Sequence, residues 1–267
     1  MHHSRTNHLT EGETHCPDIV PEERSLKDSN GKAEEKSERI ASVSDALAIG
    51  NVLQHLLVGW PAYLLFGATG GSSRGISNHF VPLNSSLFPG KWKMKVLYSD
   101  LGIVTMLALL WQWARVEGSW TPVMLVYILP YLVVNCWLVL YTWLQHTDVD
   151  IPHLDADSWT WIRGAFLTVD RPYPRIIDFL HHHIGTTHVA HHINSKIPHY
   201  NAELATKAIR DAFPDFYLYD PTPVHEALFR VAKNCVAVEK REMVDVSDAG
   251  CSAFWTYMSG QIGHKIE

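Results

Sequence analysis

The chain is organised around one stretch, Thr186-Thr187-His188-Val189-Ala190-His191-His192. Its core has the form H-x-x-H-H. On an α-helix, residues at i, i+3 and i+4 share one face, so His188, His191 and His192 can direct three imidazoles to one place. This spacing predicts a metal site. A histidine-rich surface helix that binds no metal is the competing interpretation.

A cluster of histidines indicates a transition-metal site but does not identify the metal. Imidazole suits iron, copper and zinc, and neutral nitrogen ligands leave a bound iron free to take up oxygen. A zinc hydrolase is disfavoured, because the sequence contains no H-E-x-x-H motif with its general-base glutamate.

Composition excludes several other classes. The 267 residues are 46% hydrophobic, with 17 His and 10 Trp, and the net charge of −6 gives no argument for nucleic-acid binding. The four cysteines are scattered without a C-x-x-C pair, so we predict neither disulfides nor a zinc ribbon but a reduced, cytosol-facing setting. No apolar signal-peptide region opens the sequence.

Three apolar stretches, at about 50–66, 96–114 and 122–144, follow a charged run near residues 22–40 that reads as a solvated linker. Residues 123–144 carry no charge over a length that crosses a hydrocarbon core of ~30 Å. We predict a transmembrane helix there, bent at Pro130. A second span is predicted at 96–114. Its apolar run begins after Asp100 and ends at the interfacial pair Trp111 and Trp113.

The first apolar stretch is interrupted by Gln54, His55, Gly59 and Pro61. We predict an interfacial or buried helix here, because histidines that serve one site must lie on one side of the bilayer. An even number of spans between them satisfies that condition.

Three lysines, Lys91, Lys93 and Lys95, precede the second span, whereas the turn at 115–119 holds one basic residue. The positive-inside tendency therefore places the histidines in the cytosol. After residue 144 we predict a cap of helices, including segments from about Arg175, at 202–213 and at 224–238. The predicted fold is an all-α integral membrane protein in three parts: a polar segment (1–48), the membrane region (49–145) and a cytosolic cap (146–267).

Five segments together resemble the membrane-bound acyl-lipid fatty acid desaturases of the Δ12/ω-3 type. They are His2-His3-Ser4-Arg5-Thr6-Asn7-His8, Gly59-Trp60-Pro61-Ala62-Tyr63-Leu64, Leu144-Gln145-His146-Thr147-Asp148, the run from Arg163 to Arg171, and Thr187-His188-Val189-Ala190-His191-His192. They occur in the order seen in that family, and the resemblance runs from residue 1 to about 235.

The resemblance implies an oxygen-dependent enzyme that places a cis double bond in membrane-lipid acyl chains. It implies two non-haem irons held by three histidine boxes and an extra histidine, on the cytosolic face of the endoplasmic reticulum. The matching metal ligands in this chain are His2, His3, His146, His188, His191 and His192, with His183 a weaker candidate. No catalytic residue beyond these is implied. Electrons would come from cytochrome b5 or ferredoxin.

On the family pattern, the first box and the hairpin before it would lie upstream of residue 1, so we expect an N-terminally truncated chain whose ligand set alone holds neither iron properly. Three explanations stay open: an incomplete gene model, an inactive paralogue that binds lipid or a partner desaturase, and a site completed across a dimer. Histidine-box hydroxylases are a further alternative, and segments 144–146 and 164–171 favour a desaturase over them.

Overall fold

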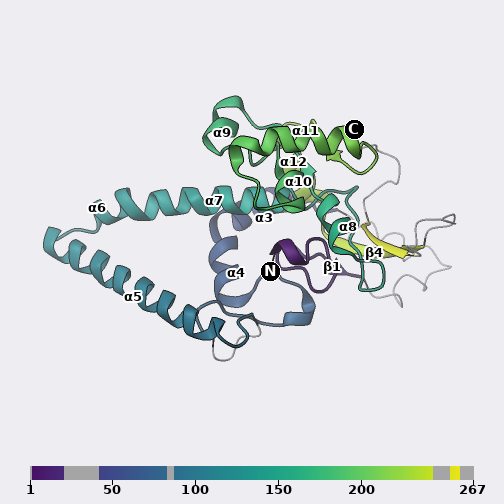
Figure 1. Ribbon diagram of the computed structural model, residues 1–267. Helices are drawn as coiled ribbons and strands as arrows, with labels where there is room; N and C mark the ends of the chain where they lie inside the picture. The colour runs from purple at the N-terminus through teal and green to yellow at the C-terminus, as the bar shows by residue number, and fades with distance from the viewer. Residues whose placement is uncertain (1, 21–41, 83–86, 243–252, 259–267) are drawn as a thin grey trace.

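The computed structural model describes residues 2–20, 42–82, 87–242 and 253–258, so the predicted charged linker lies outside the described residues. The fold is mainly helical (Figure 1). The α-helices are α3 (Asp45–Gln54), α4 (Trp60–Phe66), α5 (Trp92–Glu117), α6 (Thr121–Val123), α7 (Leu129–Leu144), α8 (Trp161–Phe166), α9 (Arg175–Leu180), α10 (His188–Ile193), α11 (Ala202–Ala212) and α12 (Val224–Asn234). Shorter helices of other types are the 3-10 turns η1 (His2–Ser4), η3 (Ser72–Arg74) and η5 (His199–Asn201) and the π-helical turns η2 (His55–Gly59) and η4 (Met124–Ile128). The strands are β1 (Asp18–Ile19), β2 (Val169–Asp170), β3 (Leu218–Tyr219), β4 (Ala237–Glu242) and β5 (Ala253–Tyr257).

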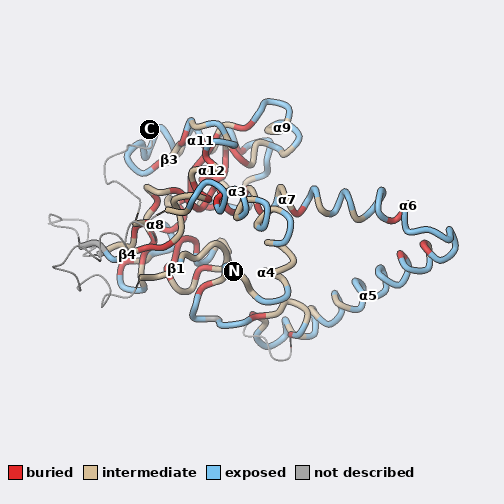
Figure 2. Tube along the Cα trace, turned by 180° about the vertical axis from the view of Figure 1, so that it is seen from behind, coloured by how far each residue is buried: buried red, intermediate tan, exposed pale blue. Residues whose placement is uncertain are grey.

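Two long helices form the predicted hairpin. Helix α5 has 26 residues and the continuous helix α6–η4–α7 has 24, and both are long and apolar enough to cross a membrane. Gly118 ends α5 in the left-handed conformation, with a φ of 63°, and so lets the chain reverse. The two helices meet at this tip and diverge toward the rest of the molecule (Figure 1). Their apolar side chains are largely exposed (Figure 2), which is the expected surface of a helix in lipid.

The first apolar stretch forms a third continuous helix, α3–η2–α4, of 22 residues, which also has the length and composition of a membrane span. Its contacts with α7 fall within about two turns. The His55 ring stacks 4.3 Å from the Trp143 ring, and the Cys136 thiol donates to the Leu56 carbonyl at 3.2 Å. The helix therefore crosses the base of α7 instead of running along it (Figure 1). Its predicted interfacial placement stays a prediction.

Both π-helical turns lie just before a proline. Turn η2 ends two residues before Pro61, and η4 ends two residues before Pro130. Proline lacks an N–H, and its ring clashes with the carbonyl four residues earlier. A local π turn accommodates that clash without ending the helix, so the irregularity predicted at Pro130 takes this form.

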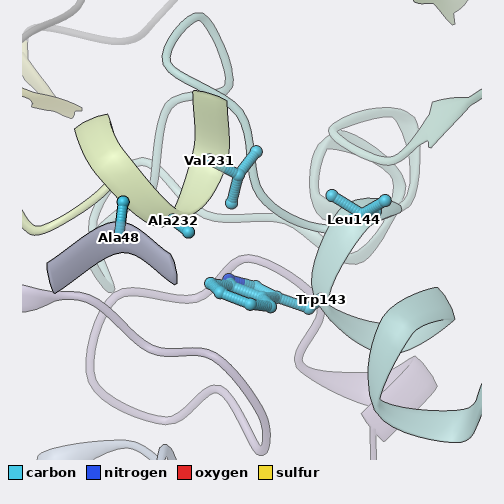
Figure 3. Close-up of a cluster of buried hydrophobic side chains, with 5 residues drawn as sticks. All are labelled: Ala48, Trp143, Leu144, Val231 and Ala232. Atoms are coloured by element: carbon cyan, nitrogen blue, oxygen red, sulfur yellow. The ribbon is translucent and has the colours of Figure 1, made fainter. Parts of the chain in front are cut away.

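The base of the hairpin is anchored in a hydrophobic cluster built from three helices. It contains Ala48 of α3, Trp143 and Leu144 of α7, and Val231 and Ala232 of α12 (Figure 3). The Trp143 ring packs against α3 and α12 in this cluster, so the apolar hairpin and the predicted cap share one core.

Two small sheets correct the prediction of an all-α fold. One has the order β1-β4-β5, in which β1 runs parallel to β4 and β4 antiparallel to β5; the other pairs β2 with β3 in parallel. The helix expected at 224–238 ends at Asn234, because Ala237 and Val238 join the first sheet, where Val238 packs with Leu9 and Tyr257. These pairings join distant segments, so local sequence gives little sign of them.

Gly59 tests the crossing of the third helix over α7. A Cβ at Gly59 would lie 3.6 Å from both Val139 methyl groups, which is ordinary contact, but a larger side chain has no room. We expect Gly59→Leu to destabilise the protein by about 1–3 kcal/mol through overpacking. The measurement is the Tm of the detergent-solubilised protein, with Gly59→Ala expected to be nearly neutral.

Gly102 is the matched control, because nothing lies within 4 Å of a Cβ built on it in the long helix α5. Gly102→Leu should leave Tm unchanged or raise it slightly, since Leu has the higher helix propensity. Equal Tm values for the two leucine variants would contradict the crossing.

Candidate metal centre

Helix α10 carries His188, His191 and His192, and neighbouring side chains hold its first turn. The Asp170 carboxylate, on β2, accepts the Val189 N–H at 2.9 Å. Thr187 donates its hydroxyl to the His183 carbonyl at 2.7 Å. A helix of six residues is too short to be stable alone, so these contacts decide its orientation.

The other three predicted ligands reach α10 from two further segments. His2 and His3 lie on η1, where the Trp161 indole N–H donates to the His3 carbonyl at 3.1 Å. His146 follows the last turn of α7, and its N–H donates to the Trp143 carbonyl at 3.3 Å. The N-terminal segment therefore positions His2 and His3, and the end of the apolar hairpin positions His146.

All six predicted ligands lie in one network of contacting rings. His146 is 4.6 Å from His2, 4.6 Å from His192 and 5.0 Å from His188, measured between ring centroids. His3 is 4.5 Å from both His191 and His192. The structure thus brings together histidines separated by as many as 190 positions in the sequence. His192 contacts the rings of both His146 and His3.

The ring nitrogens are spaced as they would be around a metal ion. His146 Nε2 lies 3.1 Å from His2 Nε2 and 3.0 Å from His188 Nε2. Two imidazoles on one ion, with bonds of ~2.1 Å at right angles, would be about 3.0 Å apart. His2, His146 and His192 each offer one nitrogen within 4.8 Å of the others. The donor set therefore fits a divalent transition metal.

The buried His192 ring provides a second test of that fit. The Thr6 hydroxyl donates to the His2 carbonyl at 3.1 Å, so its oxygen accepts the Nδ1–H of His192, also at 3.1 Å. His192 Nε2 is then the unprotonated nitrogen, and it is buried with no hydrogen-bond partner among the described residues. A ring in this tautomer and orientation is poised as a ligand.

Burial keeps these imidazoles neutral. Loss of solvent, and secondarily the neighbouring His3, lowers the pKa of both His2 and His191 to about 4. Burial also lowers the pKa values of His146, His188 and His192 well below the usual range, with neighbouring imidazoles adding to the effect. At neutral pH each ring therefore keeps the nitrogen lone pair that a metal needs.

Sequence reasoning missed the residues that orient the ligands. They are Thr6 on His192, Thr14, whose hydroxyl lies 3.3 Å from His2 Nδ1, and Asp170 at the start of α10. Tyr217 donates to the other Asp170 oxygen at 2.7 Å. Burial raises the pKa of Asp170 to about 6 despite these hydrogen bonds. No local pattern marks these residues, because each forms its hydrogen bond with a residue at least 12 positions away in the sequence.

Two further histidines have positions that the sequence left open. His183 Nδ1 bonds the Asp178 carboxylate at 2.7 Å, and no ring contact joins His183 to the six-ring network within the described part of the chain. His15, which was not predicted, is half-buried beside the cluster, with its ring 6.1 Å from Trp143 and its Nε2 3.3 Å from the Thr142 hydroxyl. Burial lowers the pKa of His15 to about 3.

Comparison with known proteins supplies the remaining observation. Residues 1–222 match the family model described as "Fatty acid desaturase". The chain is 37% identical to a Delta(12)-fatty-acid desaturase of Arabidopsis thaliana, over 89% of this chain and 58% of that protein. It is 42% identical to an oleoyl-12-hydroxylase of Ricinus communis, over 70% of this chain and 48% of that protein. It is also 42% identical to an "Omega-6 fatty acid desaturase, endoplasmic reticulum" of Brassica juncea, over 68% of this chain and 47% of that protein. The chain thus spans about half the length of these relatives.

Replacement of Thr6 tests the orientation of His192. Thr6→Val keeps the side-chain shape but removes the acceptor for the Nδ1–H, so we expect metal affinity to fall about 10- to 100-fold. Thr6→Ser retains the hydroxyl and should restore affinity. The measurement is metal content by mass spectrometry after dialysis against graded chelator. Equal metal retention by the two variants would remove Thr6 from this role.

His153 gives a pH test away from the six predicted ligands. It is buried, its Nε2 lies 3.3 Å from the Tyr257 hydroxyl, and burial lowers its pKa to about 4. In the unfolded chain His153 has a pKa near 6.5 and is protonated at a pH where the folded chain keeps it neutral. The free energy of unfolding therefore falls as the pH drops from 6.5 toward 4. From pH 7.5 to pH 5 this one residue should cost about 2 kcal/mol.

The measurement is Tm across that pH range for the parent protein and for His153→Gln, which does not titrate. The variant should show the shallower decline. Parallel curves would contradict the assignment of a neutral buried His153.

Proposed function

The chain belongs to the fatty acid desaturase family, and from that premise we propose that the protein introduces a cis double bond at the Δ12 position of membrane-lipid acyl chains. The observation that carries the proposal is the convergence of six histidines from three segments, with ring nitrogens 3.0 and 3.1 Å apart. The Δ12 position is supported by the names of relatives with 35–41% identity. An ω-3 position is the other outcome within the predicted desaturase type.

The reaction explains why such a cluster is needed. Two hydrogens leave adjacent methylenes, and O2 takes them up, with two electrons and two protons from a donor, to give two waters. No side-chain acid or base of ordinary pKa removes hydrogen from an unactivated methylene, so bound iron would supply the oxidising chemistry.

Two groups of histidines suit a pair of irons. His2, His146 and His188 form the group in which ring nitrogens approach most closely, and His3 and His191 form the other. His192 lies against both groups. Because imidazole is a neutral donor, these residues, together with the ligands expected from the first histidine box, would hold the ions without cancelling the charge that activates oxygen. Buried surroundings would keep water from the site.

The membrane topology is part of the proposal. We place α5 and α6–η4–α7 across the bilayer, α3–η2–α4 at its surface and the histidine cluster on the cytosolic side. The endoplasmic reticulum is the proposed membrane, in line with the name of the Brassica juncea relative. An external donor, cytochrome b5 or ferredoxin, would supply the electrons.

Hydroxylation is the second candidate, because the Ricinus communis relative is named as an oleoyl-12-hydroxylase. It uses the same oxidant, but one oxygen atom enters the chain as a hydroxyl and the other leaves as water. The residues of the cluster do not separate the two outcomes, since both begin with removal of hydrogen from the same methylene. Product analysis separates them.

The test is expression of the native-length protein in a host whose membranes hold oleate but no linoleate. Mass spectrometry of the acyl chains should show a new cis double bond at Δ12. A 12-hydroxy product would move the assignment to a hydroxylase, and an added ω-3 double bond would change the position. An unaltered acyl profile with correctly inserted protein would contradict the enzyme proposal.

Single His→Ala changes test the ligands. His146→Ala, His188→Ala and His192→Ala should each reduce product to background, because a missing ligand leaves a coordination position to water. His225→Ala is the matched control, since the His225 side chain is 84% exposed on α12. Protein level and membrane insertion should be equal in all four variants. Normal product from any of the first three would remove that residue from the ligand set.

A further inference from the structure

Helix α9 presents an apolar surface that the centre does not use. Ile176, Phe179 and Leu180 are 73%, 69% and 60% exposed. They stand at i, i+3 and i+4, so they share one face of the helix. We call these three side chains the α9 patch. Contiguous exposed apolar side chains of this kind mark a surface that contacts a membrane or another protein.

The opposite side of α9 is held firmly, so the direction of the patch is set. Asp178 accepts the Thr186 hydroxyl at 3.1 Å and bonds His183 Nδ1 at 2.7 Å. These two partners belong to the segment that leads into α10. The α9 patch is consequently directed away from the segment that carries the metal-site helix.

The length of the second hairpin helix indicates the depth of α9 relative to the bilayer in the proposed topology. Helices rise 1.5 Å per residue, so the run from Thr121 to Tyr141 covers ~30 Å, the thickness of a hydrocarbon core. The Tyr141 hydroxyl lies 2.8 Å from the Nδ1 of His181, the residue that directly follows α9. The His181 ring also contacts Trp137 at 4.7 Å. The last turn of α9 therefore lies where a membrane-spanning α7 would leave the hydrocarbon region.

The surroundings match a membrane interface. Trp137, Tyr141 and Tyr173 cluster at this level, and aromatic residues of this kind are enriched at the headgroup boundary. Arg175, at the start of α9, is exposed and suits lipid phosphates. In Figure 1, α9 lies on the side of the cap that faces the hairpin.

We propose that the α9 patch rests in the interfacial region of the bilayer, with its three side chains among the upper acyl carbons. The patch is a second membrane contact of the cap, separate from the hairpin, and Asp178 links it to the segment before α10. The cap is thereby held against the lipid from which its substrate comes. The inference rests on the proposed membrane topology.

Three probes, each made by adding one cysteine to the full protein, test it after reconstitution into phosphatidylcholine nanodiscs. Phe179→Cys reports on the patch. Phe216→Cys is the matched control, because Phe216 is an aromatic residue, 62% exposed, that contacts Phe166 of α8, far from the hairpin in Figure 1. Val104→Cys, at a position 62% exposed in the middle of α5, reports on the hairpin itself. Each carries a polarity-sensitive fluorophore, and the parent protein gives the labelling background of the native cysteines.

Quenching from two sides separates the outcomes. We expect the Phe179→Cys probe to be quenched by lipids with a nitroxide near the headgroup and shielded at least about threefold from iodide relative to the Phe216→Cys probe. The Val104→Cys probe should be quenched by lipids with a nitroxide deep in the acyl chain.

Equal iodide quenching at Phe179→Cys and Phe216→Cys, with Val104→Cys quenched by the deep nitroxide, would overturn the proposal and leave the hairpin intact. Shielding of Phe179→Cys from both iodide and lipid nitroxides would assign the patch to a protein partner or a second copy, which also overturns it. Loss of deep quenching at Val104→Cys would instead refute the topology on which the inference rests.

Discussion

The ion pairs of the buried Arg171 guanidinium are the interactions on which the rest of the structure depends. The Arg171 side chain is fully buried, donates from Nε to the Leu144 carbonyl at 2.9 Å, and pairs with Asp148 and Asp220. Arg230 of α12 bridges the same two carboxylates at 2.6 Å each. Burial alone would raise the pKa of Asp148, but Arg171 and Arg230 together lower it below its usual value. Removing any one partner would leave an uncompensated charge in the interior, which is strongly destabilising.

This charge cluster determines the geometry of the histidine cluster. Asp148 stands two residues after His146, and Arg171 directly follows Asp170, which holds the first turn of α10. The ion pairs therefore fix the end of the apolar hairpin against the segment that orients the three histidines of α10. A shift of either segment by one residue would separate ring nitrogens that now lie 3.0 Å apart. Rigid support of this kind is what a set of metal ligands requires.

The parts predictable from sequence were those with a local signal. Apolar stretches of membrane length predicted both arms of the hairpin, and the structure gives them bounds of Trp92–Glu117 and Thr121–Leu144. The H-x-x-H-H spacing predicted three imidazoles on one side of a helix, and the family resemblance placed His146 among the candidate ligands. The sheet that joins β1, β4 and β5, the crossing of His55 over Trp143, and Thr6 and Asp170 were not predictable in this way. Each depends on contacts between segments far apart in sequence, which no local periodicity encodes.

The last turns of α7 connect the apolar hairpin to the histidine cluster. Trp143 packs in the core with α3 and α12 while its other contacts include the rings of His55 and His15. Tyr141 bonds His181 beside α9, and His146 follows within two turns as part of the histidine cluster. Because a helix is stiff over this length, the tip of the hairpin and the position of His146 cannot vary independently. In the membrane topology and function proposed above, an acyl chain would therefore meet the histidine cluster at a height set by α7, and that height would be a physical basis for selecting one methylene along the acyl chain.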